Sequence, residues 1–348
     1  ERSTMGHESE DDFEHLFEDL DLTSSKLGKT EKAKNTLISK VLYHLNKVDF
    51  DLTNQSSDVL GDAYEYLISR FAANAGADAG EFYTPQPVST ILAQIVTYGK
   101  SRLKSVYDPT CGSGSLLLRV AREVGEVSNI YGQESVPTVY NLARMNMILH
   151  DVHYRKFDIK QEDTLEHPQH IDERFEAVVA NPPYSFKWSS NPLHLNDDRF
   201  SQYGRLAPKS KADYAFVQHI IQSLSKNGRT AILLPHGGLF RDGEEDIREK
   251  LVQDDKLETV IGLPKDMFYN SPMEACIMIF RKNKTGKRKD HVLFINAIKD
   301  FERIDNKNFV NESHIKKISD VYEKFETVKD FSYVADVDEI KQNDNILS

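Results

Sequence analysis

From Ser105 onward, the sequence alternates short apolar segments with segments of helical periodicity, and this alternation constrains the fold more than any other feature. The expected strands are residues 105–107, 130–132, 155–159, 175–180, 231–235, 257–263, 275–280 and 291–296. The expected helices among them include residues 116–124, 138–150 and 214–225. Strands that alternate with helices indicate an α/β fold with a doubly wound, mostly parallel sheet. We expect about seven to eight strands, with ligands bound beyond their carboxyl ends.

A helical region is expected before this sheet. Apolar residues recur at helical spacing in residues 30–45 and again in residues 59–73. Thr84 followed by Pro85 predicts a further helix that runs to about residue 98, with Thr84 as its cap. The expected divisions are an α-helical N-terminal domain (1–79), an α/β domain (80–335) and the start of a C-terminal tail (336–348).

The charge of the chain bears on its substrate. The formal net charge is −11. A protein that binds duplex DNA by itself usually has a basic face, because contacts to phosphates dominate the affinity. Two explanations stay open on charge alone: the substrate is not nucleic acid, or another subunit supplies most of the contacts to it.

Composition excludes several classes of protein. No segment approaches the ~20 apolar residues that a bilayer-spanning helix requires, and the first residues have no signal-peptide pattern. Cys111 and Cys276 lie far apart and match no metal or disulfide framework. No spacing of His, Cys and Asp indicates a metal site. We therefore expect a reduced cytoplasmic protein with no membrane segment and no metal.

A glycine loop joins the first expected strand to its helix, with the sequence Asp-Pro-Thr-Cys-Gly-Ser-Gly-Ser at residues 108–115. Gly112 and Gly114 allow a tight turn and a close approach of a ligand to the backbone. The next strand ends at Glu134, which is placed to accept hydrogen bonds from ribose hydroxyls. Asp163 follows the third strand and is placed to accept a hydrogen bond from an adenine amino group, although Glu162 is adjacent.

NAD and S-adenosylmethionine both contain the adenosine that this arrangement would hold. The loop is not a P-loop, because no Gly-Lys-Ser/Thr follows it. Leu117 stands where the complete dinucleotide-binding pattern requires its last glycine. A ligand without a pyrophosphate is therefore favoured.

The turn Asn181-Pro182-Pro183-Tyr184 directly follows the apolar strand end at 178–180. Two prolines fix φ and remove two donors, so the turn is stiff. The side-chain oxygen of Asn181 and the carbonyl oxygen of Pro182 then form two convergent acceptors, which suit a planar amino group such as that of adenine. Tyr184 supplies an aromatic face on which a flipped base can stack, contributing ~1–3 kcal/mol. The simpler interpretation is a rigid turn that ends a strand.

Residues 108–114 and 181–184, in that order, resemble the cofactor and catalytic motifs of amino-group DNA methyltransferases of the γ arrangement. Residues 80–85 (Gly-Glu-Phe-Tyr-Thr-Pro) and 60–68 narrow the resemblance to the modification (M) subunit of type I restriction–modification systems. The likeness covers nearly the whole chain, including residues 17–22. It implies a Rossmann-like methyltransferase fold for residues 80–335 and site-specific transfer of a methyl group from S-adenosylmethionine to N6 of adenine in DNA.

The resemblance also implies roles for single residues. Thr84 would lie over the methionine part of the cofactor, and Asp108 near its amino group. The residues implied to bind the cofactor are Glu81, Phe82, Tyr83, Thr84, Asp108, Thr110, Gly112, Ser113, Gly114, Ser115, Leu116, Glu134, Asp163 and Asn181. The implied catalytic residues are Asn181, Pro182, Pro183 and Tyr184, and Phe268 would contact the flipped base. Ser115 departs from the pattern, since many relatives have a further glycine there.

The resemblance implies partners as well. An M subunit works with a separate DNA-specificity (S) subunit, commonly two M to one S, and a restriction (R) subunit joins some of these complexes. This division would explain the acidic balance, since another chain reads the DNA sequence. The family is usually longer at both ends, so we expect part of the helical region and a C-terminal part to be missing from this chain.

Two other functions stay open. The Asn-Pro-Pro-Tyr turn also serves methyltransferases that modify the side-chain amide of glutamine in proteins, although the helical preface and residues 80–85 argue against this. A non-catalytic scaffold that binds S-adenosylmethionine within a DNA-binding complex is a hypothesis of another class.

Three further features have competing interpretations. Asp213 is expected to cap the helix that follows it, rather than to act in catalysis. The basic run at 282–289 is expected to be an exposed hairpin connection, with a phosphate contact as the alternative. Residues 185–213 lack clear periodicity and hold the single tryptophan, Trp188, which is typical of a functional lid or of disorder.

Overall fold

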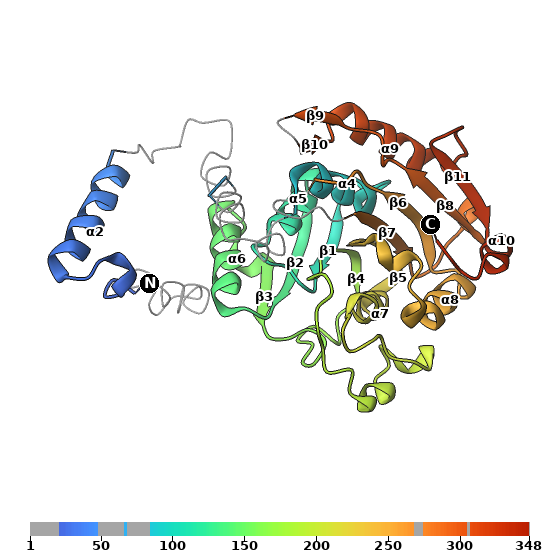
Figure 1. Cartoon of the computed structure of the whole chain (residues 1–348), viewed down its shortest axis with the longest axis horizontal. Coiled ribbons are helices and arrows are strands. Elements are labelled where there is room, and N and C mark those ends of the chain that lie inside the picture. Colours follow the sequence, from blue (N-terminus) through green and yellow to red (C-terminus); the bar gives the residue numbers. More distant parts are fainter. Residues whose placement is uncertain (1–20, 48–65, 68–83, 268–273, 305–306, 348) are drawn as a thin grey trace.

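The computed structural model describes residues 21–47, 66–67, 84–267, 274–304 and 307–347. Within these residues the chain forms a large central sheet with helices on both of its faces (Figure 1). The described residues of the sheet domain run from Thr84 to Leu347, apart from 268–273 and 305–306. A separate two-stranded ribbon consists of β9 (Glu302–Ile304) and β10 (Lys307–Phe309).

Nine strands make up the central sheet, in the order β11-β8-β6-β7-β5-β4-β1-β2-β3. Their bounds are β1 (Leu103–Asp108), β2 (Val127–Glu134), β3 (Phe157–Gln161), β4 (Phe175–Ala180), β5 (Leu224–Pro235), β6 (Leu257–Gly262), β7 (Ala275–Arg281), β8 (His291–Asn296) and β11 (Ser332–Asp336). Strands β7 and β11 are antiparallel to their neighbours, and every other pairing is parallel. The predicted α/β fold with a doubly wound, mostly parallel sheet is confirmed.

The sheet has one strand more than the seven to eight expected. Strand β11 pairs antiparallel with β8 at the edge of the sheet. Only two of its five residues, Ser332 and Ala335, are buried, and its two ends, Ser332 and Asp336, are polar. A short edge strand of this composition lacks the continuous apolar run that identified the central strands.

Helices cover the two faces of the sheet and enclose two hydrophobic cores. One face is covered by α4 (Gln86–Thr97), α5 (Ser115–Val124), α6 (Pro137–Leu149) and α9 (Glu312–Lys324). The other face is covered by α7 (Asp213–Ser223), α8 (Glu245–Gln253) and α10 (Val337–Gln342). The remaining turns are the 3-10 helices η1 (Ser25–Leu27), η3 (Tyr154–Lys156), η4 (Pro192–Asn196), η5 (Ser201–Tyr203), η6 (His236–Leu239), η7 (Asp242–Glu244) and η8 (Gly286–Arg288).

Helix α4 begins one residue later than predicted. Its N-cap is Pro85 rather than Thr84, and Pro87 occupies the first turn. Proline is favoured there because its missing N–H has no partner within a helix in any case. Ends of helices commonly shift by one or two residues, and the predicted end near residue 98 agrees with the observed end at Thr97.

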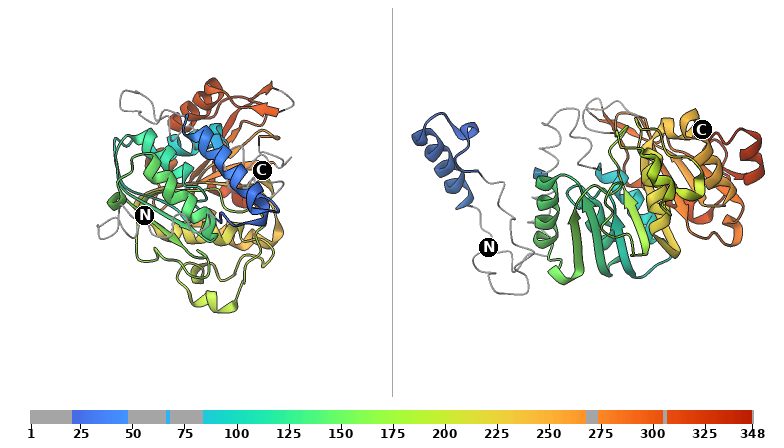
Figure 2. Two further views of the ribbon diagram at one scale, coloured as in Figure 1. Left: turned by 90° about the vertical axis from the view of Figure 1, so that its left-hand side faces the viewer. Right: turned by 90° about the horizontal axis from the view of Figure 1, so that it is seen from below.

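Helix α2 (Glu31–Leu45) lies apart from the sheet domain in Figure 1 and in the right view of Figure 2. Thr30 caps it, and its side-chain oxygen accepts a hydrogen bond from the N–H of Ala33 at 3.2 Å. No residue of α2 is buried. The predicted helix at 59–73 lies outside the described residues, apart from Tyr66 and Leu67.

The residues from Asp336 to Leu347, expected as the start of a C-terminal tail, pack against the sheet domain. Helix α10 packs its Ile340 into the second core, and Leu347 is also buried. The guanidinium of Arg248 donates to the carbonyl oxygen of Asn345 at 2.8 Å. Intermittent apolar residues in a polar segment gave too weak a periodicity to predict this packing. Of the helices in the described residues, none is long and apolar enough to cross a membrane.

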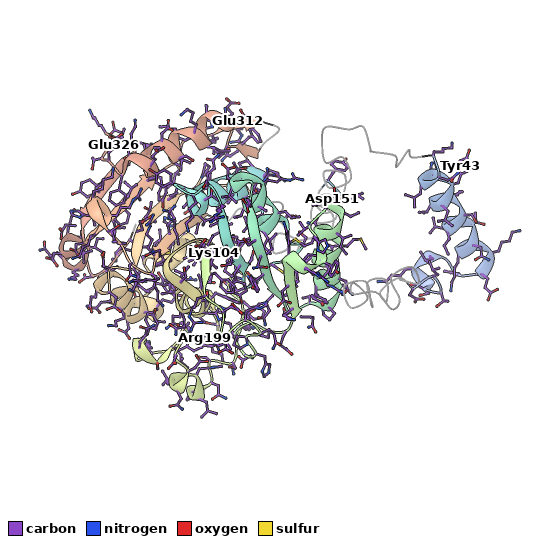
Figure 3. The ribbon with its side chains drawn as sticks, turned by 180° about the vertical axis from the view of Figure 1, so that it is seen from behind. Tyr43, Lys104, Asp151, Arg199, Glu312 and Glu326 are labelled. Atoms are coloured by element: carbon purple, nitrogen blue, oxygen red, sulfur yellow. The ribbon has the colours of Figure 1, made fainter. Side chains whose placement is uncertain are left out.

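The segment between β4 and α7 is folded rather than extended. It is the yellow-green part at the bottom of Figure 1, and Figure 3 labels Arg199 within it. Residues 185–212, here called the insert, are anchored by buried Arg199, which donates to the carbonyl oxygens of Thr164 at 3.1 Å and Leu165 at 2.9 Å. Trp188 is also buried, and its indole N–H donates to the carbonyl oxygen of Pro208 at 3.1 Å. The guanidinium of Arg199 therefore ties the insert to the loop after β3, where His194 of the insert also lies 3.3 Å from the carboxylate of Glu166.

Replacing Arg199 by Met should lower the free energy of unfolding by roughly 2–5 kcal/mol, because two buried carbonyl groups and the Asp197 carboxylate lose their partner. Denaturant-induced unfolding measures the change. Arg205→Met is the matched control, since Arg205 is half exposed and pairs with Asp246 on the surface. It should cost less than ~1 kcal/mol. Equal losses in the two variants would contradict this role of Arg199.

Candidate functional site

The glycine loop leaves the carboxyl end of β1 and turns into α5. Gly112 and Gly114 have φ values of 54° and 77°, a region that favours glycine. A Cβ at Gly114 would lie 2.7 Å from the Cε atom of Met147 in α6, so the end of that methionine would have to move, and the positive φ would strain any side chain there. The side-chain amide of Asn146 donates to the carbonyl oxygen of Ser113 at 2.8 Å. Helix α6 therefore supports the loop from behind.

Glu134, the last residue of β2, ties the glycine loop to the second strand. One carboxylate oxygen accepts a hydrogen bond from the N–H of Gly112 at 3.0 Å. The other accepts from the N–H of Val136 at 2.9 Å. Each carboxylate oxygen has two acceptor positions, so Glu134 keeps the capacity to accept hydrogen bonds from a ligand.

Asp163 lies in the turn that follows β3. Its carboxylate accepts hydrogen bonds from the N–H groups of Leu165 at 2.8 Å and Glu166 at 3.2 Å. The next residue, Thr164, donates from its hydroxyl to the carbonyl oxygen of Pro109. The turn after β3 is thereby joined to the loop after β1.

Asn181 is the first residue after β4 and is 7% exposed. Its side-chain oxygen is buried and has no hydrogen-bond partner among the described residues. A buried acceptor that lacks a donor is costly in a folded protein, roughly 1–3 kcal/mol, and such a group requires an explanation. A donor on a bound molecule is the simplest one, because Asn181 lines two adjacent cavities.

These two cavities share Thr110 and Asn181 in their walls. The smaller, of about 20 Å³, is lined by Thr84, Asp108, Thr110, Cys111, Gly112, Ser113, Ser115, Leu116 and Asn181. The larger, of about 120 Å³, is lined by Pro109, Thr110, Glu134, Ser135, Val136, Glu162, Asp163, Thr164, Asn181, Pro183, Phe186 and Phe216. The fold thus brings together residues that are up to about 130 positions apart in the chain.

Most of the predicted site residues that the structure describes border these cavities. Gly114 and Pro182 belong to the loop and the turn but do not line the cavities, and Pro182 is buried. Tyr184 lies at the edge of the first core and is partly buried. The predictions for Glu81, Phe82, Tyr83 and Phe268 concern positions outside the described residues.

The walls of the two cavities are acidic. Asp108, Glu134, Glu162 and Asp163 contribute four carboxyl groups, and no Lys, Arg or His lines either cavity in the described part of the chain. Burial raises the pKa of Asp108 to about 7, and the charge of Glu134 adds to the shift. Burial also raises the pKa of Glu134, although hydrogen bonds from Val136 and Gly112 oppose it. Such a site favours a cation over an anion.

Asp213 is not the cap of α7. The cap is Ala212, and Asp213 is the first helical residue and is 1% exposed. Its carboxylate forms an ion pair with Arg241 and accepts a hydrogen bond from the N–H of Ser185 at 3.4 Å. Arg241 also donates to Glu244 at 2.8 Å. The interpretation of Asp213 as a cap is therefore wrong, because a distant arginine competes for the carboxylate.

Sequence reasoning missed Phe186 and Phe216 as residues that line the larger cavity. Phe216 lies in the helix expected at residues 214–225, whose periodicity does not show which distant segment the ring contacts. Phe186 lies in the insert, where no periodicity indicated its direction. Ser135 and Val136 were also missed. They directly follow Glu134 at the carboxyl end of β2, where ligands bind in such sheets, so their position could have predicted that they line the cavity.

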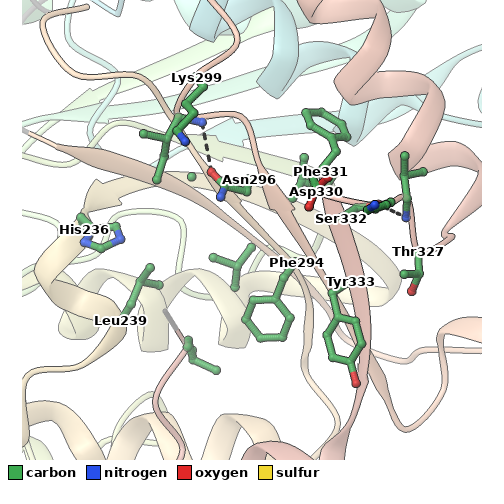
Figure 4. A pocket seen from close by; sticks show the side chains of 17 residues that line it. His236, Leu239, Phe294, Asn296, Lys299, Thr327, Asp330, Phe331, Ser332 and Tyr333 are labelled. Atoms are coloured by element: carbon green, nitrogen blue, oxygen red, sulfur yellow. Dashed lines mark hydrogen bonds between the residues drawn. The ribbon is translucent and has the colours of Figure 1, made fainter.

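A cavity of greater volume than either of these lies elsewhere in the described structure. It measures about 740 Å³, and His236, Asn296 and Lys299 are among the residues around it (Figure 4). Phe294 and Tyr333 lie beside each other on its sheet side. None of the predicted site residues borders it. We nevertheless assign the functional site to the two cavities that share Thr110 and Asn181. In this type of sheet a site is identified by polar groups that converge at the carboxyl ends of strands, and not by the volume of a cavity.

No cluster of metal-ligating side chains occurs among the described residues. The two cysteines, Cys111 and Cys276, are both buried and free.

Comparisons with known proteins agree on one family. The chain matches the family described as N-6 DNA Methylase over residues 55–348. It is 38% identical to the type I restriction enzyme MpnII methylase subunit of Mycoplasma pneumoniae, over 98% of this chain and 65% of that protein. It is 34% identical to the type I restriction enzyme HindI methylase subunit of Haemophilus influenzae, over 84% of this chain and 68% of that protein.

A solved structure supports the same assignment. The crystal structure of the type I restriction-modification system methyltransferase subunit from Streptococcus thermophilus matches with a TM-score of 0.91 and 43% identity. The match covers 97% of this chain and 72% of that one. The chain spans between 55% and 68% of the length of the first three curated relatives that it matches.

The raised pKa of Asp108 predicts a pH effect on stability. A carboxyl group that binds its proton more tightly in the folded state stabilises the fold as the pH falls through the folded pKa, here about 7. From pH 8 to pH 6 the gain is about 1.4 kcal/mol. Asp108→Asn should remove this part of the pH dependence and be the more stable protein at pH 8. Denaturant titrations of both proteins at pH 6 and pH 8 measure the free energy of unfolding. If that free energy changed with pH by the same amount in both proteins, the raised pKa of Asp108 would be refuted.

Proposed function

The chain belongs to the N-6 DNA methylase family, among the type I restriction enzyme methylase subunits, and on that premise we propose that it transfers a methyl group from S-adenosylmethionine to N6 of adenine in DNA. The observation that best supports this activity is the buried, unpartnered side-chain oxygen of Asn181 beside the two cavities. An amino group of the substrate would supply the missing donor.

Asn181 would act on the amino group itself. The nitrogen of adenine's amino group is a poor nucleophile, because its lone pair is delocalised into the ring. Acceptance of its N–H hydrogen bonds by Asn181 and by the carbonyl oxygen of Pro182 would favour a pyramidal nitrogen and localise that lone pair. The two prolines keep the turn rigid, so the acceptors need no reorganisation when the substrate binds.

The acidic cavities suit S-adenosylmethionine. This molecule, when bound, supplies an electrophilic methyl group on a positively charged sulfonium. Its positive charges would be stabilised by Asp108 and Glu134, which have no ion-pair partner among the described residues. The same carboxylates would repel the pyrophosphate of NAD, which argues for the ligand without a pyrophosphate.

The wider cavity would hold the adenosine part. Glu134 would accept from the ribose hydroxyls and Asp163 from the adenine amino group. The rings of Phe186 and Phe216 in the wall offer apolar contact to a flat base. Thr84, in the narrower cavity, would contact the methionine part. We propose the same role, binding of the cofactor, for the residues just before Thr84, which are Glu81, Phe82 and Tyr83. This part of the proposal rests on the resemblance of the sequence.

The target adenine would be flipped out of the duplex to reach Asn181. We assign Tyr184 to stacking on the flipped base, with Phe268 as a second aromatic contact. Tyr184 follows the rigid turn directly, and Ser185 behind it is anchored to buried Asp213. This anchor would keep the ring of Tyr184 at a fixed distance from the amino acceptors.

We further propose that the chain acts as the modification subunit of a type I complex, with a specificity subunit in the ratio of two M to one S and with a restriction subunit as a further partner. Its acidic net charge of −11 supports a division of labour in which another chain supplies most of the contacts to DNA. The methylase subunits that it resembles are named as parts of type I restriction enzymes.

Asn181→Ala should lower methyl transfer to DNA by at least about 100-fold, because the amino group loses an acceptor that acts mainly in the transition state. The assay follows labelled methyl groups into DNA, with the affinity for S-adenosylmethionine measured by calorimetry. That affinity should stay within a few-fold of wild type. Undiminished methylation of DNA would refute the mechanism. Label that enters protein acceptors instead of DNA would favour a glutamine methyltransferase.

Glu134→Gln should weaken the binding of S-adenosylmethionine by roughly 10- to 100-fold, because one of two acceptor oxygens becomes an NH2 group that faces a backbone N–H. Glu162→Gln is the matched control, since it removes the same charge from the wall of the same cavity. It should weaken binding much less. Calorimetric titration compares the two variants, and equal losses would show that charge alone is recognised.

A further inference from the structure

The insert is positively charged in an acidic chain. Residues 185–212 contain five basic and two acidic residues, whereas the whole chain contains 44 basic and 55 acidic residues. Three of the basic residues are the lysines Lys187, Lys209 and Lys211 at the two ends of the insert. The other two are the arginines Arg199 and Arg205 in its middle.

Backbone hydrogen bonds bring the two ends of the insert together. The N–H of Ala212 donates to the carbonyl oxygen of Phe186 at 2.9 Å, and the N–H of Trp188 donates to the carbonyl oxygen of Lys209 at 3.1 Å. We call residues 185–188 and 209–212 the neck of the insert. The neck places Lys187 alongside the segment that holds the other two lysines.

Positive charge at the neck is not neutralised within the described residues. The two arginines of the insert form ion pairs with Asp197 and Asp246. The three neck lysines form none in that part of the chain, and Lys187 and Lys209 are exposed. Lys211 donates only to the hydroxyl of Ser185 at 3.4 Å. Like charges on adjacent segments repel one another, so this gathering suits an external anion.

The neck lies at the mouth of the candidate site. Phe186, in the neck, lines the larger cavity together with Asn181 and Pro183. Lys187 is the next residue along the chain. Arg199 ties the insert to the loop after β3, and Trp188 is buried in the second core, so the neck rests on a fixed base.

The other basic run of the chain is used differently. The ammonium of Lys284 donates to the carbonyl oxygens of Leu257 at 2.8 Å and His291 at 2.7 Å. Arg288 is buried and donates to the carbonyl oxygen of Tyr322 at 2.7 Å. This run connects β7 to β8 at the amino end of β8, opposite the edge that bears the site. Its two buried cations therefore satisfy backbone oxygens.

We propose that Lys187, Lys209 and Lys211 bind the phosphate backbone of the DNA duplex beside the flipped adenine. This inference rests on the proposed function and adds to it the surface by which this chain contacts DNA. Ammonium groups bind phosphates without regard to base sequence, and such contacts set register and orientation. The neck thus holds the duplex next to Asn181 while another chain selects the sequence.

The test measures binding of a short duplex of random sequence by the full chain, assembled with its specificity subunit, over a series of salt concentrations. The triple variant Lys187→Gln, Lys209→Gln and Lys211→Gln should reduce the slope of log affinity against log salt by about 2 to 3, since each phosphate contact contributes about 0.9. Its affinity at about 0.1 M salt should fall on the order of 10-fold or more. Conversion of the same lysines to Arg should keep the wild-type slope.

A second triple variant controls for total charge. Lys104, Lys226 and Lys289 are exposed residues on the opposite edge of the sheet domain, and Figure 3 labels the first of them. Their replacement by Gln should leave the slope unchanged. The thermal unfolding midpoint of each variant reports whether the fold is intact.

The inference would be overturned by a wild-type slope in the neck variant, or by an equal loss in the control triple. Salt-dependent binding can be read without any methylation. A wild-type complex that transfers no methyl group to DNA would therefore contradict the proposed function alone, whereas an unchanged slope in an active enzyme would contradict only the role of the neck.

Discussion

Parallel pairing of β1 with β2 on one side and with β4 on the other is the constraint on which the site depends. The register sets Asp108 opposite Gly132 and Tyr107 opposite Val178. Because the three strands run in the same direction, the residues that follow them emerge at one edge. A slip of one residue in either pairing would turn the side chains to the opposite face. The register of these strands therefore fixes the positions at which distant segments of the chain meet at this edge.

The site holds negative charge at the expense of stability. Asp108 and Glu134 are buried without a cationic partner among the described residues, and burial raises the pKa of both. Elsewhere in the molecule buried carboxylates are paired, as Glu258 is with Arg281 and Arg288. Unpaired buried charge concentrated at one strand edge is characteristic of functional sites rather than of structural ones.

The basic side chains also have two different roles: some are buried and bind backbone oxygens, and others are exposed at the surface. Buried Arg199, Lys284 and Arg288 satisfy carbonyl oxygens that would otherwise lack donors. This use of charge explains why a basic run in the sequence did not correspond to a free basic surface. The net charge of the chain also concealed the positive neck of the insert, because an average does not report where charge is placed.

Much of the fold and part of the site could be predicted from local signals. The periodicity of residues 175–180 and 291–296 identified β4 and β8 within their observed bounds, since apolar strands are recognisable from consecutive residues. The glycine loop and the Asn181 turn were recognisable because each is a short motif whose chemistry does not depend on distant residues.

The sequence by itself therefore determined the type of sheet, the order of its elements and the kinds of groups at the strand ends. Only the tertiary structure decided which distant residues meet those groups. It pairs Asp213 with Arg241, sets Phe186 and Phe216 in the wall of the cavity, and closes the neck of the insert. These outcomes depend on contacts between segments far apart in the chain, which no local periodicity encodes.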